Sequence, residues 1–450
     1  MKTVSFLLIT LLVLTCSSCE KYLEEKPDKT LVVPSTVRDL QALLDDSYTM
    51  NLSITPSMPE SSSDDFFLTS DAYNSNNEIA MHVYTWSLKE YSYANDWSNA
   101  YMPVYNANLC LEKITTLQRT SQNALEWDNV KGAALFYRSF YFLNLAWEFA
   151  KAFDVASASD DPGIVLRTGS DFNVKSERSS VKATYDLIIK NTKESIALLP
   201  TSVTGVMRPS KTAAYALLAR VYLSMRMYDS AYLYANRALK ANSNLMDYNL
   251  LDLNDANPFP RFDNPETIFY TEMNGSNGLH GTYQAFIDTV LYDSYDSNDL
   301  RKQGFFFETG GYHSFKGNYS KDPYTFFSGI AVDEILLIRA ECLARKNLLA
   351  EAMADLDALL IKRWHNTLPY TPVTADNMNE ALDKILLERR KELTMRGLRW
   401  IDIKRLNKEE RNIVPERVIG NTIIKLPAND NRYALPIPSD IIRITGIAQN

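Results

Sequence analysis

Residues 210–240 read SKTAAYALLARVYLSMRMYDSAYLYANRALK, and residues 332–362 read VDEILLIRAECLARKNLLAEAMADLDALLIK. The two segments align when Ala219 is placed opposite Ala340, and apolar residues then match on both sides of a central turn. Small alanines where two helices cross let the helices approach closely, with larger apolar side chains around them. Each segment is therefore predicted to form a hairpin of two helices.

Three further segments have apolar residues at helical spacing: Asn99–Leu117, Val130–Phe153 and Ser180–Leu199. Gly (15 of 450) and Pro (18 of 450) are scarce, which indicates long regular elements. The hairpin pattern resembles the tetratricopeptide repeat, whose units stack to bury a shared face. We predict a mainly α fold in which tetratricopeptide-like helix hairpins form the scaffold of a single compact body, with long loop-rich insertions and minor β structure.

Two insertions differ from the helical segments in composition. Ser53–Asn77 is rich in Ser, Asp, Asn and Pro, and Pro258–Ser328 is rich in Tyr and Phe. Tyr is abundant in the whole chain, at 26 residues, and its ring can lie at a boundary between apolar surface and water. Because loops on a rigid scaffold carry function more often than the scaffold does, these insertions are predicted to form a binding surface.

The N-terminus has the pattern of a secretory signal. Lys2 is followed by an apolar run, Val4–Leu14, that is too short to span a bilayer. Small residues then lead to Cys19, in the order typical of a bacterial lipoprotein signal, so we predict that residues 1–18 are removed and that Cys19 carries lipid. Cys16 as the lipidated residue and a plain secretory signal are the alternatives.

Cys110 and Cys342 are the cysteines that remain beyond the signal. Each lies within a helical apolar pattern, which favours a buried free thiol. A disulfide between them in an oxidising compartment is the alternative.

Motifs for nucleotide, metal and nucleic-acid chemistry are missing from the sequence. It has no GxGxxG after a strand, no GxxxxGK[ST] and no HExxH, and its four histidines have no Cys or carboxylate at ligand spacing. EF-hand spacing is absent too. The net charge is −8 without a basic cluster, which argues against a polyanion as partner. We therefore predict no metal, no cofactor and no nucleic acid, with a calcium ion held by loop carboxylates and carbonyls as the alternative. A pair of glycosidase carboxylates is neither indicated nor excluded among 55 acids.

The C-terminal region combines charged helices with a proline-rich end. Ile385–Leu393 and Gly397–Arg405 bring acidic and basic residues around a turn, which predicts a structural ion-pair network, and Pro436 and Pro438 predict an extended closure. The charged residues of this predicted network are Glu388, Arg389, Arg390, Arg399, Asp402 and Arg405.

Together with Cys19–Pro27, Asp96–Asn108 and Arg138–Tyr141, these segments resemble the SusD/RagB family, the lipid-anchored substrate-binding proteins of outer-membrane nutrient uptake systems. The likeness runs along almost the whole mature chain. At two positions the chain departs from the family, which often has an acidic residue where Arg396 stands and Asn-Pro where this chain has Thr445 and Gly446. With the resemblance, the chain divides into the signal peptide at 1–18, an N-terminal SusD-like region with helical repeats at 19–240, an aromatic-rich insertion at 241–330, and a C-terminal SusD/RagB region at 331–450.

The resemblance implies a protein without catalysis on the outer face of the outer membrane, working with a SusC-like TonB-dependent transporter. Aromatic faces can stack on sugar rings while polar side chains bind hydroxyl groups. A peptide ligand, an all-helical glycoside hydrolase or lyase, and a purely structural tetratricopeptide-type interaction protein are the alternatives. The candidate ligand-binding residues, chosen by composition and location, are Asp65, Tyr73, Trp86, Trp97, Tyr283, Tyr295 and Tyr312.

Overall fold

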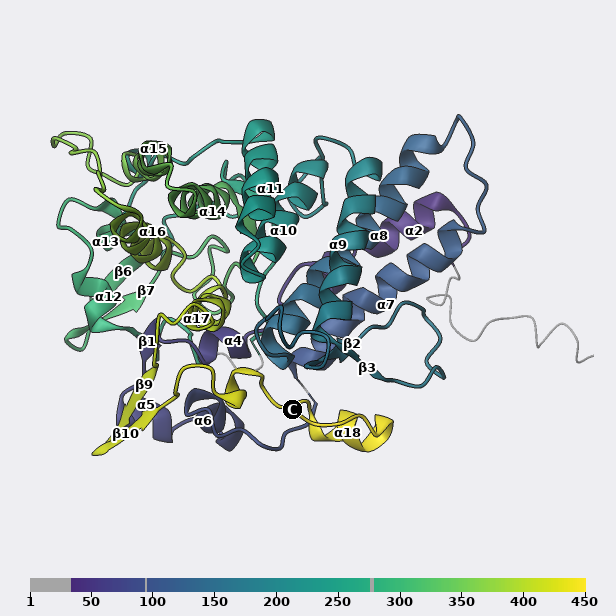
Figure 1. Cartoon of the computed structure of the whole chain (residues 1–450), viewed down its shortest axis with the longest axis horizontal. Coiled ribbons are helices and arrows are strands. Elements are labelled where there is room, and N and C mark those ends of the chain that lie inside the picture. The colour runs from purple at the N-terminus through teal and green to yellow at the C-terminus, as the bar shows by residue number, and fades with distance from the viewer. Residues whose placement is uncertain (1–33, 94, 276–278) are drawn as a thin grey trace, which may run out of the picture.

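The computed structural model describes residues 34–93, 95–275 and 279–450. A row of long helices forms its scaffold (Figure 1). The predicted signal peptide and Cys19 lie outside the described residues. Each helix of the row packs against the next, and α16 packs on both α14 and α15. The row consists of α7 (Asp96–Ile114), α8 (Ala124–Phe149), α9 (Val181–Leu198), α10 (Lys211–Ser224), α11 (Tyr228–Ala241), α14 (Val332–Arg345), α15 (Leu349–Leu360) and α16 (Met378–Glu392).

The hairpins α10–α11 and α14–α15 confirm the internal repeat. Arg226 and Asn347, which align in the two sequences, both adopt a positive φ, 61° and 59°. In each turn the following amide donates to a carbonyl five residues back, from Met227 to Tyr222 (2.9 Å) and from Leu348 to Leu343 (3.0 Å). Helix α11 packs against α14, so the two units are neighbours in space although the long insertion separates them in sequence.

The predicted helix boundaries need small corrections, each with a local cause. Helix α7 begins earlier than expected because the Asn95 side chain accepts a hydrogen bond from the Ser98 amide (2.8 Å) and caps it. Helix α8 ends at Phe149 because Ala150 is extended. Ser180 caps α9 as its hydroxyl accepts from the Ala183 amide (3.1 Å).

Most rings of the long insertion form a second hydrophobic core. Phe259, Phe305, Phe315 and Tyr319 are all buried there, within contact of one another through a chain of ring pairs. The expectation that the aromatic richness of this insertion marks a ligand surface is therefore wrong for most of its rings. The insertion lies at one end of the helix row (Figure 1).

Short antiparallel strand pairs and short helices complete the body, in agreement with the predicted minor β structure. The pairs are β1 (Phe66–Phe67) with β5 (Phe286–Ile287), β2 (Pro162–Val165) with β3 (Arg178–Ser180), β4 (Thr267–Phe269) with β8 (Ile330–Ala331), β6 (Phe306–Thr309) with β7 (Tyr312–Phe315), and β9 (Glu416–Ile419) with β10 (Thr422–Lys425). The remaining helices are α2 (Val37–Leu44), α3 (Ser47–Met50), α4 (Met58–Ser61), α5 (Ser70–Asn74), α6 (Glu78–Tyr84), α12 (Thr289–Asp293), α13 (Leu300–Phe305), α17 (Arg399–Asn407) and α18 (Ser439–Thr445), with 3-10 turns η1 (Tyr248–Leu250) and η2 (Asn431–Tyr433).

The segment at residues 57–66, which includes α4, is mostly buried and is held by arginines from the C-terminal region. Arg417 donates to the carbonyls of Ser63, Phe66 (3.2 Å) and Tyr84 (3.1 Å). Arg399 makes a two-point ion pair with Asp64, at 2.6 and 2.8 Å. The first part of this insertion, expected at the surface, therefore joins distant parts of the chain in the interior, whereas residues 69–77 lie at or near the surface.

The predicted C-terminal ion-pair network is confirmed and extends further than the sequence indicated. Asp402 accepts from Arg389 and from Arg405, each at 2.7 Å, and Arg405 also pairs with Glu341 on α14. Arg396, where the family often has an acid, pairs with buried Asp333 (3.1 Å).

Cys110 and Cys342 are buried free thiols, as expected, so they do not pair with each other. Within the described ranges, we find no helix long and apolar enough to cross a membrane.

Candidate ligand-binding surface

Three rings meet where β1, β5 and β7 come together. Phe67 on β1 lies opposite Phe286 on β5 in the strand register. Tyr312, at the start of β7, lies 5.1 Å from each of the two rings, measured between ring centroids, and is partly exposed. The three strands thus bring together an aromatic cluster in which Phe67 and Phe286 are half-buried and Tyr312 is the most exposed ring.

Tyr283 and Tyr324 form a second, more exposed group. Their ring centroids are 5.6 Å apart, and the residues are 68% and 65% exposed. Tyr283 stands three residues before Phe286 in the chain, so both groups belong to the same end of β5. We call Phe67, Phe286, Tyr312, Tyr283 and Tyr324 together the aromatic surface.

Hydrogen bonds hold the turns that carry Tyr283 and Tyr324. The Thr282 hydroxyl donates to the Pro323 carbonyl (2.8 Å), which joins the two turns. Asp322 accepts from the amides of Tyr324 (2.7 Å) and Thr325 (2.9 Å), which fixes the second turn. The tyrosines are therefore presented by backbone that is already ordered, which lowers the entropic cost of binding.

Amide side chains lie close to this aromatic surface. Asn76 donates to Gln284 (3.3 Å), the residue next to Tyr283. Ring faces can stack on the apolar face of a sugar, while amide groups and tyrosine hydroxyls bind its hydroxyl groups. The surface has the chemistry of a carbohydrate-binding platform.

Two of the predicted binding residues, Tyr283 and Tyr312, belong to the aromatic surface. Tyr73 lies nearby in sequence to the amide pair, but its ring is partly buried and packs on Tyr84, with centroids 5.9 Å apart. Trp97 is buried on α7 and lines a separate cavity. The structure thus does not collect these four residues into one site.

Asp65, Trp86 and Tyr295 are buried and offer no surface to a ligand in solution. Asp65 pairs with Arg390 (2.9 Å), and burial raises its pKa to about 6 although Arg390 and Arg399 oppose the shift. The Trp86 indole donates to the Ser62 carbonyl (2.9 Å). The Tyr295 hydroxyl donates to the Lys391 carbonyl (2.7 Å). All three side chains stabilise the interior.

Tyr324, Phe67 and Phe286 belong to the aromatic surface but were not chosen from the sequence. Each was visible as one more ring in an aromatic-rich segment, and nothing in the local pattern separates an exposed ring from a buried one. The fact that Tyr283 and Tyr324 pair depends on the packing of two turns about forty residues apart.

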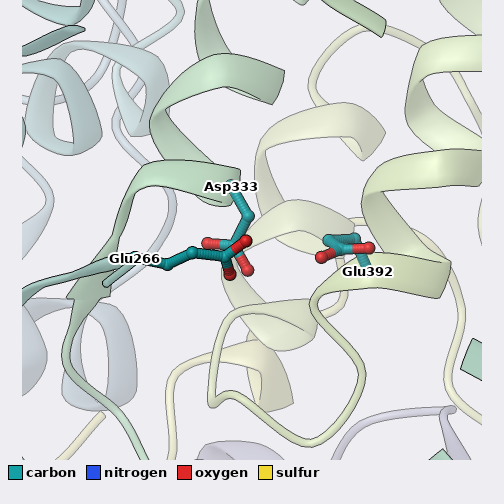
Figure 2. Close-up of side chains that lie close together, drawn as sticks. All are labelled: Glu266, Asp333 and Glu392. Atoms are coloured by element: carbon teal, nitrogen blue, oxygen red, sulfur yellow. The ribbon is translucent and has the colours of Figure 1, made fainter. Parts of the chain in front are cut away.

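Glu266, Asp333 and Glu392 are buried carboxylates that lie close to one another, with an oxygen of each within 4.8 Å of the others (Figure 2). Arginines already pair with all three: Arg363 with Glu266 and Glu392, both at 2.7 Å, and Arg396 with Asp333. Because these guanidinium groups neutralise the carboxylates, we describe the cluster as an ion-pair core and assign it no metal.

This cluster predicts a pH-dependent stability. Burial, with Glu266 and Glu392 nearby, raises the pKa of Asp333 from 3.8 to about 7, although Arg396 opposes the shift. Between pH 4 and 7 the folded state therefore binds more protons than the unfolded state, so this carboxyl lowers the free energy of unfolding as the pH rises. In Asp333→Asn the amide does not titrate, and the wild type should lose stability relative to this variant, on the order of 2 kcal/mol, between pH 4.5 and 8. Urea denaturation across this range measures the difference, and parallel curves would contradict the prediction.

Two family descriptions match the sequence. The SusD-like family described as starch-binding and associating with the outer membrane matches residues 21–223, and the SusD family, SusD/RagB, matches residues 332–447. No curated protein matches.

Several solved structures share the fold. A SusD superfamily protein from Bacteroides thetaiotaomicron is 21% identical with a TM-score of 0.75, over 92% of this chain and 99% of that one. One from Bacteroides fragilis is 22% identical with a TM-score of 0.72, over 92% and 99%. A SusD-like carbohydrate-binding protein from Bacteroides vulgatus is 19% identical with a TM-score of 0.68, over 92% and 97%. At these identities the likeness establishes the fold.

Proposed function

Because this chain belongs to the SusD/RagB family, we propose that it is a lipid-anchored protein of the cell surface that captures an oligo- or polysaccharide and delivers it to a SusC-like TonB-dependent transporter. The family description, starch-binding and associating with the outer membrane, supports a glycan as ligand and the outer membrane as location. Cys19 is the proposed lipidation site. The protein binds its ligand without chemical change.

The exposed pair Tyr283 and Tyr324 is the observation that carries the proposal for the ligand site. Large rings exposed side by side lose their contact with water only when a ligand or partner covers them. Such an exposed pair therefore indicates a binding site. Here the two rings are ordered by their turns and lie beside amide groups, so a sugar can stack on the rings and form hydrogen bonds at the same time.

The test is affinity electrophoresis and calorimetry with a panel of soluble polysaccharides. Replacing Tyr283 and Tyr324 together by Ala should weaken binding of the retained glycan by about ten- to fiftyfold, since each stacked ring contributes about 1 kcal/mol. Both side chains are exposed, so the variant should keep the wild-type melting temperature.

Tyr48→Ala is the matched control, because Tyr48 is even more exposed than Tyr283 and Tyr324 but lies on α3, outside the aromatic surface. It should bind like the wild type. The folded wild type could bind no glycan of a broad panel and instead yield bound peptides, identified by mass spectrometry after purification. That result would assign a peptide, and not a glycan, as the ligand. Glycan binding that the double variant leaves unchanged would move the site elsewhere.

A further inference from the structure

A cavity of about 730 Å³ lies apart from the aromatic surface, between the first half of α7, the loop at residues 166–177 that connects β2 to β3, and α18. These elements adjoin one another at the end of the molecule opposite the insertion (Figure 1). No residue of the aromatic surface lines the cavity. Its volume is within the range of sites for small organic ligands.

One wall of this cavity is a row of aromatic rings. Trp97, Tyr101 and Tyr105 are four residues apart on α7 and therefore share one face of the helix. The ring centroids of Trp97 and Tyr101 are 5.0 Å apart. Phe172 from the loop stacks on Tyr105 at 4.9 Å with an angle of 18° between the rings, although it remains 77% exposed. The wall is therefore largely aromatic, and Phe172 is its most exposed ring, whereas Trp97 is buried.

Several polar groups around the cavity are used within the protein. The Tyr101 hydroxyl donates to the Val165 carbonyl (2.6 Å). Arg167 donates to the Val174 carbonyl and to the Ser176 hydroxyl, each at 2.7 Å, and Asn108 donates to the Arg167 carbonyl (2.8 Å). These bonds shape the loop and leave mainly ring faces and aliphatic groups toward the cavity. A polyol would find few hydrogen-bond partners there, whereas an apolar ring would lose only contact with water.

We propose that this cavity is a second binding site, which takes an uncharged planar aromatic group, either as a free small molecule or as a substituent on a larger ligand. The near-parallel stack of Phe172 on Tyr105 and the ring row of α7 favour a planar group over an alkyl chain, because offset stacking adds to the area buried. The proposal does not depend on glycan binding at the aromatic surface.

The probe for this site is N-phenyl-1-naphthylamine, an uncharged dye whose fluorescence rises when it leaves water. We expect saturable binding of one dye per protein. Phe172→Ser removes one ring, and Met102→Lys places a charge at the mouth of the cavity, so each should weaken dye binding about tenfold or more. Both side chains are exposed, and circular dichroism and the melting temperature should confirm that these variants fold.

Leu125→Ser is the matched control, since Leu125 is exposed at the start of α8, away from the cavity, and dye binding should be unchanged. The Tyr283→Ala, Tyr324→Ala double variant should also bind the dye like the wild type, which separates this site from the aromatic surface. Absence of saturable dye binding by the wild type, or equal binding by Phe172→Ser, Met102→Lys and Leu125→Ser, would overturn the proposal.

Competition identifies the source of the aromatic group. Displacement of the dye by 2-naphthol and by an aryl glucoside, but not by methyl glucoside, would support a site that accepts an aromatic substituent. Displacement by 2-naphthol alone would support a free small molecule. Stronger displacement by n-decanol than by 2-naphthol would overturn the assignment to a planar ring.

Discussion

Replacing Arg405 by Met is expected to lower the free energy of unfolding by about 3 kcal/mol. The Arg405 guanidinium is buried and donates to both carboxylate oxygens of Glu341, at 2.7 and 2.8 Å, and to Asp402 at 2.7 Å. Met has a similar length but no charge, so two buried carboxylates lose a partner. In the variant, Glu341 keeps its ion pair with Arg345, and Asp402 keeps its ion pair with Arg389. The expected loss is therefore at the lower end of the range for a broken buried pair. Urea denaturation measures it.

The control for Arg405→Met is Arg432→Met. Arg432 also makes a two-point pair, with Asp430 at 2.8 and 2.9 Å, but it is exposed. Because water solvates both of these groups in either state, the loss should be below about 1 kcal/mol. Equal losses in the two variants would show that burial does not determine the strength of this network.

Replacing Gly329 by Ala is expected to cost about 3 kcal/mol, near the upper end of overpacking effects. An added Cβ would overlap the Phe269 carbonyl oxygen and lie 2.6 Å from the Phe327 ring. The carbonyl belongs to β4, which pairs with β8 directly after Gly329, so the clash falls on backbone that cannot rotate away. The Gly329 carbonyl also accepts from Arg220 (2.7 Å), and any shift weakens that bond. Thermal and urea denaturation measure the loss.

Gly275→Ala provides the comparison. Among the described residues, a Cβ at Gly275 has no neighbour within 4 Å, and its φ is not in the left-handed region. This change should leave the melting temperature within a degree or two of the wild type. A small effect of Gly329→Ala would contradict the prediction. It would mean that the backbone where β4 pairs with β8 can shift to accommodate the added Cβ.

The sequence predicted the helical scaffold because local patterns encode it. The alignment of Ala219 with Ala340 located both hairpins, and the structure adds that the matched turn residues Arg226 and Asn347 share a left-handed conformation. The C-terminal charges were also predicted to form a structural network, since so many ionisable residues near one turn need partners. The spacing of apolar residues along a helix and the clustering of charges involve residues close in sequence. Both can therefore be recognised in a single sequence.

The site was predicted less completely than the scaffold. Tyr283 and Tyr312 reach the aromatic surface, but Asp65, Trp86 and Tyr295 are buried. Composition marks a segment as rich in rings, yet burial depends on which other segments cover each ring. Asp65 illustrates this, because its partner Arg390 comes from the opposite end of the chain.

The sequence by itself therefore determined the helix hairpins, their repeat and the family, since periodicity and motif order are properties of contiguous residues. The tertiary structure alone decided which of the many aromatic rings lie at the surface. It also decided that residues 57–66 form a mostly buried segment held by Arg390, Arg399 and Arg417, and that α7, the 166–177 loop and α18 line a cavity. The physical reason is that burial and enclosure arise from contacts between segments far apart in sequence, and no local pattern records which segments meet.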